Sequence, residues 1–510
     1  MNEKTRTSNS IKNVIVAVAC QLAGSLLGFV TKTIFLDLLG DTYNGMVGLF
    51  ANIVSVLSLA ELGLGTAITF ALYKPIAEKN VEKLQSLMRF YKKVYAYIAV
   101  IVLVLGLLLL PFIPMLMKGV EGDSNVSWYY LIYIVSTVSS YLFIYKSALL
   151  NADQRNRIVR LVHLIFVIVR NLVEIGVLIL THNFVVYLLV QLLCTFLNNF
   201  TISIIANKLY PWLKLKAEKL AKSETKKIFS DVRSVVFYKV GGVLLNNTDS
   251  ILITAIVGIV AVGFYSNYMM LVSLVMGMLE LMFSALSGSI GNLNAVTSKE
   301  HSKKVYDVIG FIGFWIYTFC AISLFVLLDD VILFWIGEDR VLGKVISLAL
   351  SLNLFVPGLL QNTMVFRNTT ALFRKTKFII LITAILNIVL SILLGIFWGI
   401  AGIIFATSIS RLLTNFWYEP LVLHRDIFKV KPSGYFIKIF KYILVATLAG
   451  LTTYLLASLV ELVGILGIFI KAIICLFVPN IAILLFFCRN EQFKECVARV
   501  KKLFKKRKSA

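Results

Sequence analysis

The chain has 510 residues, of which 59% are hydrophobic, and its mean hydropathy is +0.88. Soluble domains contain roughly 45–50% apolar residues, so the composition excludes an ordinary soluble protein and predicts one continuous membrane domain. The net charge of +24 lies in short segments between apolar runs, a pattern of membrane insertion that argues against a nucleic-acid partner.

The N-terminal segment, residues 1–12, is polar and precedes a long apolar run without a small-residue cleavage site. We therefore expect a retained first membrane helix and not a removed signal peptide. The six cysteines form no CxxC pair and the four histidines are scattered. Free thiols are expected, with no metal site and no cofactor.

Fourteen segments are apolar enough to cross a bilayer, which takes about 20 residues of helix. Lipid admits only helices or closed barrels, and these runs are too long for barrel strands, so the sequence predicts an all-α polytopic membrane protein. The boundary near Trp398 has no charged break. The predicted spans are 13–36, 44–72, 94–117, 127–150, 158–180, 184–206, 234–257, 262–290, 306–334, 342–366, 378–397, 400–422, 439–459 and 462–487.

The distribution of basic residues predicts the orientation. With a cytoplasmic N-terminus and fourteen crossings, the inner segments hold 40 Lys and Arg residues and the outer loops hold 3. This asymmetry obeys the positive-inside rule and predicts that both termini are cytoplasmic. The outer loops are acidic, with Glu121 and Asp123 in one and Glu338 and Asp339 in another.

The chain also repeats itself at an offset of 218 residues, which aligns 24–119 with 242–337. Gly40 then meets Gly258 and Gly45 meets Gly263; with three residues inserted, Tyr145-Lys146 meets Phe366-Arg367. An even number of helices in each half predicts two parallel repeats around a central cleft. The predicted parts are a six-helix lobe (1–206), a basic cytoplasmic linker (207–233), a second six-helix lobe (234–422), two further transmembrane helices (423–488) and a basic cytoplasmic tail (489–510).

The linker and the tail combine apolar residues with many lysines. Such amphipathic basic segments lie on the membrane surface, so we expect both to contact anionic lipid, with about 1 kcal/mol per basic residue near the surface. A role as a topology signal alone explains the same residues.

Seven basic residues belong neither to the inner segments nor to the outer loops and are therefore expected within the membrane. A buried cation costs about 2.5–3.5 kcal/mol, so these residues are candidates for lining a cavity. Arg170 has an acid four residues on, which offers local neutralisation, whereas Arg411 has no acid within a turn. The candidates for a cationic substrate site are Arg411, Lys146, Arg367, Arg170, Lys32 and Lys239; the seventh residue is Lys471.

The acids that oppose these cations are Glu61, Glu174, Asp249 and Glu280. The cations outnumber these acids, which favours an anionic cargo such as a phosphate or pyrophosphate. Asp249, Glu61 and Glu174 are candidates for coupling transport to a proton or sodium gradient, or else they pair with the cations.

The sequence does not resemble an enzyme. The predicted outer loops are short, and the chain contains no GxxxxGK[ST] phosphate loop. A membrane-bound polymerase or sugar transferase would place its catalytic residues in a long loop, so we expect a protein that is not an enzyme.

Three stretches carry a family resemblance: DTYNGMVGLFANIVSVLSLAELGLGTAITFALYKPIAEKN (41–80), YKSALLNADQRNR (145–157) and NNTDSILITAIVGIVAVGFYSNY (246–268). The chain resembles the Wzx-type flippases for polysaccharide repeat units, in the superfamily that includes multidrug and toxin extrusion antiporters and lipid II flippases. The resemblance implies movement of an undecaprenyl-pyrophosphate-linked oligosaccharide across the bacterial inner membrane by alternating access. It also implies a cationic cavity. Whether the protein works alone or beside a polysaccharide polymerase and a chain-length regulator stays open on the sequence.

Two other functions remain open on the sequence. A lipid II flippase has a substrate with the same anionic head, so cavity charge does not separate it from the leading prediction. A multidrug cation antiporter requires an acid-rich cleft. The intramembrane Lys and Arg residues therefore argue against this function.

Overall fold

The computed structural model describes residues 3–61, 64–117, 125–214, 218–370 and 372–498, and these residues form helices and turns but no strand. The protein is an all-α membrane protein, as predicted. Its chain folds into two compact units, Met1–Ser266 and Asn267–Ala510, which are described separately.

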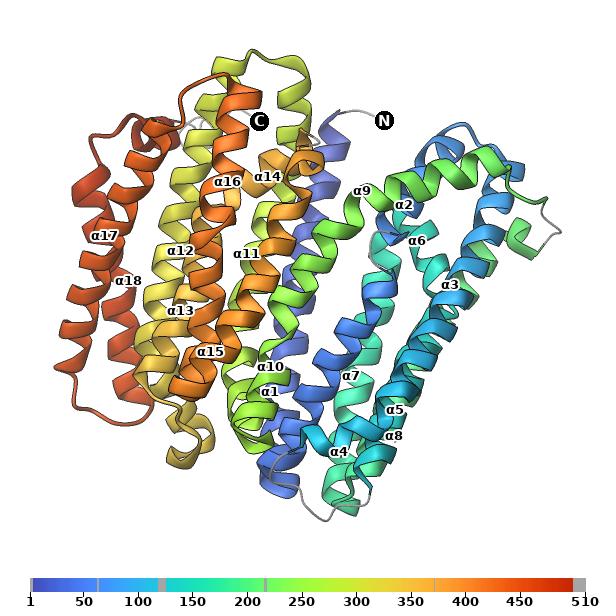
Figure 1. Cartoon of the computed structure of the whole chain (residues 1–510), viewed down its shortest axis with the longest axis horizontal. Helices are drawn as coiled ribbons and strands as arrows, with labels where there is room; N and C mark the ends of the chain where they lie inside the picture. Colours follow the sequence, from blue (N-terminus) through green and yellow to red (C-terminus); the bar gives the residue numbers. More distant parts are fainter. Residues whose placement is uncertain (1–2, 62–63, 118–124, 215–217, 371, 499–510) are drawn as a thin grey trace. The chain divides into compact units, whose positions relative to one another are not determined.

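In the first unit, α7 packs against α1 and α8, and α5 packs against α3 and α8 (Figure 1). The core contains many aromatic side chains, including Tyr91, Tyr130 and Phe50. The elements are α1 (Glu3–Leu57), η1 (Ser58–Glu61), α2 (Leu64–Ala77), α3 (Val81–Leu109), η2 (Leu110–Phe112), α4 (Ile113–Leu116), α5 (Val126–Tyr141), α6 (Ile144–Ala152), α7 (Asn156–Thr181), α8 (Phe184–Leu209), η3 (Pro211–Lys214), α9 (Lys222–Asn247), α10 (Asp249–Ile256) and the start of α11 (Ile259–Val296).

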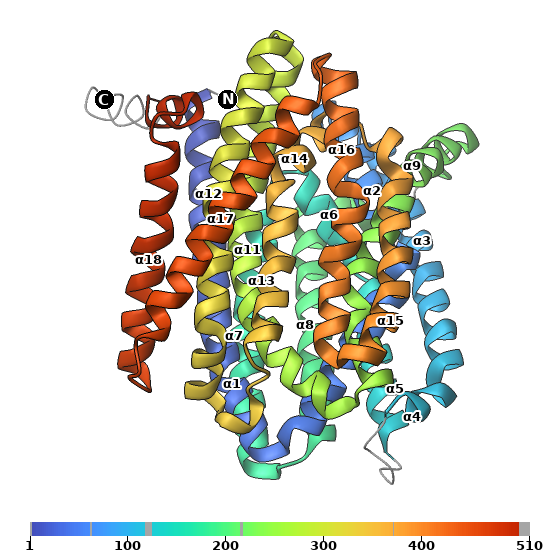
Figure 2. The same cartoon turned by 60° about the vertical axis from the view of Figure 1, so that its left-hand side comes forward.

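In the second unit, α12 packs against α13 and α18, and α17 lies beside α18 (Figure 2). The predicted pair of C-terminal helices therefore forms a hairpin against α12. After the rest of α11, the elements are α12 (Lys299–Ile336), η4 (Glu338–Arg340), α13 (Lys344–Leu359), α14 (Gln361–Thr369), α15 (Phe373–Leu413), α16 (Asn415–Leu423), the π-turn η5 (His424–Phe428), α17 (Ser433–Ser458) and α18 (Ile465–Phe487).

Within the described residues, nine helices are long and apolar enough to cross a membrane, or eleven spans if each of two bent helix pairs counts as one. Two of the nine contain a break. Gly40 interrupts α1 with φ 83°, and Gly399 interrupts α15 with φ 58°. The predicted total of fourteen stays a prediction.

The break at Gly399 reverses the chain. A straight helix would separate residues 394 and 402 by about 12 Å along its axis. Instead, a Cβ added to Gly402 would lie 2.1 Å from the Leu394 carbonyl oxygen. This turn coincides with the predicted boundary near Trp398, and the positive φ of Gly399 explains why a glycine follows the tryptophan.

The offset of the sequence repeat recurs in the helix bounds. The helices α5 and α13 each have 16 residues, α6 and α14 each have 9, and both pairs are bent by 43°. The N-cap side chains of α3 and α12, Asn80 and Ser298, also lie 218 residues apart, and each accepts a hydrogen bond from the backbone three residues on. These coincidences support two homologous halves; the proposed boundaries at 206 and 234 remain untested.

The helix bounds correct one detail of the alignment. The short helices α6 and α14 start 217 residues apart, which aligns Lys146 with Thr363. Arg367 therefore lies one turn farther along its helix than Lys146 does, so the two cations share a helix face but not a position.

In the first unit, α1 and the start of α11 cross closely at residues related by the 218-residue offset. A Cβ on Gly45 would lie 2.1 Å from the carbonyl oxygen of Ile259, and a Cβ on Gly263 would lie 2.4 Å from that of Asp41. All four positions are exchanged by the 218-residue offset. Only glycine allows two backbones to approach this closely, which explains why both glycines are present.

Candidate functional site

Two of the seven intramembrane cations form ion pairs inside the second unit. Arg367 Nη1 lies 2.6 Å from Glu419 Oε1, and the two side chains are 3% and 1% exposed. Lys471 Nζ lies 3.0 Å from Asp330 Oδ1, which joins α18 to α12. These charges are largely cancelled by partners far away in the sequence.

In the first unit, Arg170 lies 3.5 Å from Glu174, one turn away on α7. At this distance Glu174 neutralises the charge of Arg170, as the spacing of the two residues suggested. Glu174 is buried and Arg170 is about one third exposed.

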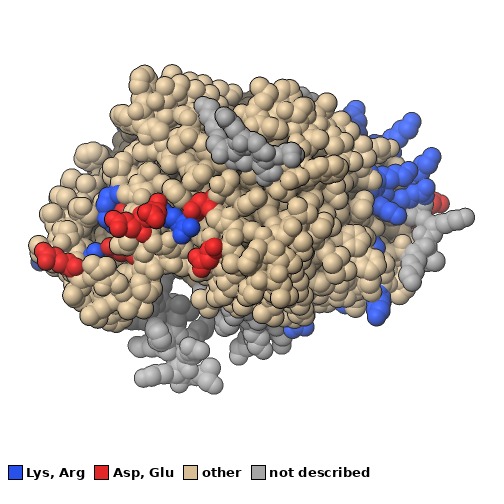
Figure 3. All heavy atoms as spheres, turned by 90° about the horizontal axis from the view of Figure 1, so that it is seen from below, with Lys and Arg blue, Asp and Glu red and all other residues tan. Residues whose placement is uncertain are grey.

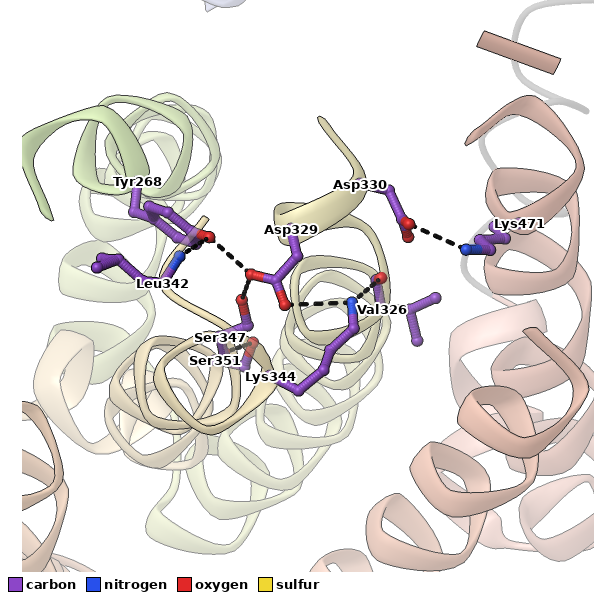
Figure 4. A network of polar contacts seen from close by, with 9 residues as sticks. All are labelled: Tyr268, Val326, Asp329, Asp330, Leu342, Lys344, Ser347, Ser351 and Lys471. Carbon is purple, nitrogen blue, oxygen red and sulfur yellow. Dashed lines mark hydrogen bonds and ion pairs between the residues drawn. The ribbon is translucent and has the colours of Figure 1, made fainter. Parts of the chain in front are cut away.

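In the second unit, the buried carboxylate of Asp329 connects several elements near η4. Asp329 Oδ1 accepts hydrogen bonds from the Tyr268 hydroxyl and from Ser347 Oγ, both at 2.7 Å (Figure 4). The ammonium of Lys344 lies 3.4 Å from the other oxygen, and the Tyr268 hydroxyl accepts a hydrogen bond from the Leu342 N–H. Asp329 thus ties α11, α12, α13 and the η4 connection together.

These acids correct the predicted surplus of positive charge. Asp329 and Asp330 lie inside the predicted span 306–334, and Glu419 lies inside 400–422, so these three acids add to the four named from the sequence. With them included, the excess of intramembrane cations disappears from the second unit. The overall charge of the spans therefore does not favour an anionic cargo, and only individual sites can do so.

In the first unit, Lys146 lies in a different environment, which we call the Lys146 site (Lys92, Lys146 and Ser203). The Lys146 ammonium donates a hydrogen bond of 2.6 Å to the hydroxyl of Ser203 on α8. Lys92 on α3 is close enough to repel it. The sequence did not indicate Lys92 as a site residue, because the segment 73–93 is predicted as a cytoplasmic loop. In the structure α3 begins at Val81 and includes Lys92.

Lys32 also has a neutral partner. Its ammonium donates a hydrogen bond to the side-chain oxygen of Asn44, and the Asn44 amide donates to the Gly263 carbonyl at 2.8 Å. Asp41 is close enough to attract Lys32. Lys32 is thus linked through Asn44 to the glycine crossing, a contact that the sequence did not indicate.

Glu61 and Lys239, which were predicted separately, belong to one group. The Tyr95 hydroxyl lies 3.3 Å from Glu61 Oε1. The Tyr141 hydroxyl shares one hydrogen bond with Glu61 and another with Ser58 Oγ, which lies 2.8 Å from the Tyr141 oxygen. Lys239 on α9 attracts Glu61 electrostatically. We call these five residues the Glu61 cluster.

The other candidates are separate. Asp249 is buried at the start of α10 and shares a hydrogen bond with the Tyr265 hydroxyl. Arg411 is buried in α15, and Glu280 is exposed on α11. In the part of the chain that the structure describes, no group of three or more His, Cys, Asp or Glu residues is suited to a metal ion.

The predicted acidic outer loops are described in part. Glu338 and Asp339 are exposed in η4, whereas Glu121 and Asp123 lie outside the described residues. On the face seen in Figure 3, acidic side chains gather in one region of a mostly uncharged surface.

Several solved structures of membrane transporters and flippases are similar to this chain. The lipid II flippase MurJ, in an inward closed conformation, is similar with a TM-score of 0.70 and 17% identity, over 93% of this chain and 99% of its own. An inward-facing multidrug resistance transporter of the MATE family has a TM-score of 0.58 and 14% identity, over 80% of this chain and 97% of its own. A MATE transporter of Vibrio cholerae has a TM-score of 0.53 and 16% identity, over 84% and 100%.

These likenesses show that the chain shares the fold of MurJ and of the MATE transporters. No curated protein sequence is significantly similar to the chain. A family model described as "Polysaccharide biosynthesis protein" matches residues 10–287, which is more than half of the sequence. The chain therefore belongs to the polysaccharide biosynthesis protein family.

Proposed function

We propose that this protein is a flippase that carries an undecaprenyl-pyrophosphate-linked oligosaccharide repeat unit from the inner to the outer leaflet. The repeat unit would serve capsule, exopolysaccharide or O-antigen synthesis. The family model supports a role in polysaccharide biosynthesis, and the fold is that of flippases and transporters.

The observation that carries the proposal is the Lys146 site. Two ammonium groups lie near each other, and the hydrogen-bond partner of Lys146 is a neutral hydroxyl. Lys92 is exposed and Lys146 is half-buried, and an anion that binds both ammonium groups would relieve the repulsion between them. A pyrophosphate supplies that anion, because its oxygens accept hydrogen bonds from several lysine ammonium groups at once.

A contrast within the chain supports this assignment. Lys146 and Arg367 lie on the corresponding short helices α6 and α14, yet Arg367 is buried against Glu419. We therefore assign substrate binding to Lys146 and a structural role to Arg367. Arg411, Lys239 and Lys32 remain further candidates, and Arg170 is the weakest because Glu174 neutralises it.

The proposed transport mechanism follows from these charges. Lysines bind the pyrophosphate head while the prenyl chain stays in lipid, so the head never crosses the apolar layer unpaired. Alternating access of two lobes would then expose the bound head to one side of the membrane at a time. We place the protein in the bacterial inner membrane with both termini cytoplasmic, beside a polymerase and a chain-length regulator.

Surface-polysaccharide export in a deletion strain tests the proposal. Lys146→Ala and Lys92→Ala should each insert normally but restore export poorly, whereas Lys93→Ala, a neighbour on α3, should restore it fully. Full export by both Lys146→Ala and Lys92→Ala would refute the site.

A lipid II flippase is the second candidate function, favoured by the similarity to MurJ over 93% of the chain. Cell-wall synthesis separates the two candidates, because loss of a lipid II flippase stops growth whereas loss of a repeat-unit flippase removes only the surface polysaccharide. A multidrug antiporter is disfavoured, since a pair of lysines repels cationic drugs.

A further inference from the structure

A pocket in the second unit lies between α12, the bend that joins α13 to α14, and α17. The helix α12 packs against both α14 and α17 (Figure 2). The pocket lies near the starts of α12 and α17, at the end of the unit that the basic residues predict to be cytoplasmic. Its empty volume is about 280 Å³, including the solvent at its mouth, and its enclosed part has room for about one water-sized group.

Two buried polar groups line this pocket without a partner. Among the described residues, none forms a hydrogen bond with the hydroxyl of Tyr442 or with the side-chain oxygen of Asn362. The two side chains are only 2% and 4% exposed. The ring of Phe314 stacks on Tyr442, with 4.2 Å between the centroids, and this contact fixes the hydroxyl. Because buried polar groups are nearly always paired, the two groups indicate a ligand that both accepts and donates hydrogen bonds.

Charged side chains surround the mouth of the pocket. Asp307 lies 2.8 Å from the Lys303 ammonium and 3.1 Å from the Lys438 ammonium, and all three side chains are partly exposed. Asp307 is also close enough to interact electrostatically with the Tyr442 hydroxyl. Two cations and one carboxylate leave a single positive charge, which matches the single negative charge of a phosphodiester. A ligand ammonium would be a third cation around one carboxylate and would be repelled by the lysines.

The surface beside the mouth is apolar. Ile437 and Phe440 flank Lys438 on α17 and are 59% and 70% exposed. Exposed apolar side chains of this kind contact lipid in a membrane helix. Basic pockets between membrane helices bind the heads of anionic lipids. A phospholipid can therefore place its phosphate at Lys303 and Lys438 while its acyl chains stay in the bilayer.

We propose that this pocket binds an anionic phospholipid whose head carries a free hydroxyl beside the phosphodiester, as in phosphatidylglycerol. The phosphate pairs with Lys303 and Lys438. One head-group hydroxyl, which is the size of a water molecule, enters the enclosed part, where it accepts a hydrogen bond from Tyr442 and donates one to Asn362. The bound head joins α12, α14 and α17, and it does not depend on the transported substrate.

Native mass spectrometry of the purified full chain tests the proposal by titration with phosphatidylglycerol and with phosphatidylpropanol, which has the same charge but no head-group hydroxyl. Wild type should bind one phosphatidylglycerol about 2–10-fold more tightly than phosphatidylpropanol, the effect of a neutral hydrogen bond. Tyr442→Phe keeps the stacked ring and should lose most of this preference. Lys438→Gln should bind both lipids about tenfold more weakly, because a charge-assisted contact is lost.

Two matched controls should bind both lipids as wild type does. Tyr454→Phe removes a hydroxyl farther along α17, where the ring packs against Phe325, and Lys431→Gln removes an exposed cation just before that helix.

Each alternative result overturns a stated part of the proposal. Equal binding of the two lipids by wild type would overturn the role of the hydroxyl. Phosphatidylethanolamine bound as tightly as phosphatidylglycerol would overturn the argument from charge. No saturable binding of lipid, or equal affinities in wild type and Lys438→Gln, would leave the pocket to a water molecule and overturn the site. Export assays of Lys146→Ala test the proposed function separately, so either proposal can fail alone.

Discussion

Replacing Glu419 by Gln should destabilise the protein strongly without altering the proposed substrate site. The Arg367 guanidinium would remain buried but lose its counter-ion. The two side chains are 3% and 1% exposed and only 2.6 Å apart, so solvent cannot screen the loss. Removing one partner from such a pair costs about 3–5 kcal/mol.

The free energy of unfolding is measured by titrating SDS into mixed micelles and following loss of helix. The double variant with Arg367→Met and Glu419→Leu removes both charges and should be far closer to wild type than Glu419→Gln, because apolar pairs replace buried ion pairs at little cost. Export per folded molecule should be unchanged in both variants.

Glu174→Gln is the matched control for the same loss of charge. Its partner Arg170 is about one third exposed and 3.5 Å away, so the expected loss is only about 1 kcal/mol or less. Equal losses for Glu419→Gln and Glu174→Gln would refute the argument from burial. So would a loss of export per folded molecule in Glu419→Gln, since Arg367 would then act on substrate.

Three further predictions follow from named contacts. Gly45→Ala should lower the free energy of unfolding by about 1–3 kcal/mol, because its Cβ would lie 2.1 Å from a carbonyl oxygen; Gly242→Ala, with no atom within 4 Å, should be neutral or stabilising in the same SDS titration. Asp330→Asn should loosen the α17–α18 hairpin by removing the ion pair with Lys471, raising the alkylation rate of the buried Cys475 thiol about 5–30-fold; an unchanged rate would contradict this. Lys146→Ala should abolish retention of inorganic pyrophosphate by the purified protein in a filter-binding assay, and full retention would contradict the anion site.

The sequence predicted the all-α fold correctly because apolar runs report helix positions directly. It also predicted the breaks well: Gly40 lies in the gap between the first two predicted spans, and Gly399 lies at the uncertain boundary near Trp398. The repeat was visible in the glycines because Gly45 and Gly263 occupy the same close crossing.

The sequence alone could not predict which distant charged residues form ion pairs. Arg170 and Glu174 lie on one helix turn, so their contact was foreseen. The partners of Arg367 and Lys471 are 52 and 141 residues away, and only packing brings them together. The bends before α6 and α14 were also missed, because both lie within uninterrupted apolar runs that read as single spans.

The most direct test of the central claim is the distribution of undecaprenyl-linked oligosaccharides between leaflets in a strain depleted of this protein. They should accumulate in the inner leaflet, with loss of surface polysaccharide and continued cell-wall growth. Lys146→Ala should fail to reverse the accumulation, whereas Lys93→Ala should reverse it. An unchanged distribution between the leaflets, with polysaccharide export intact, would contradict the account.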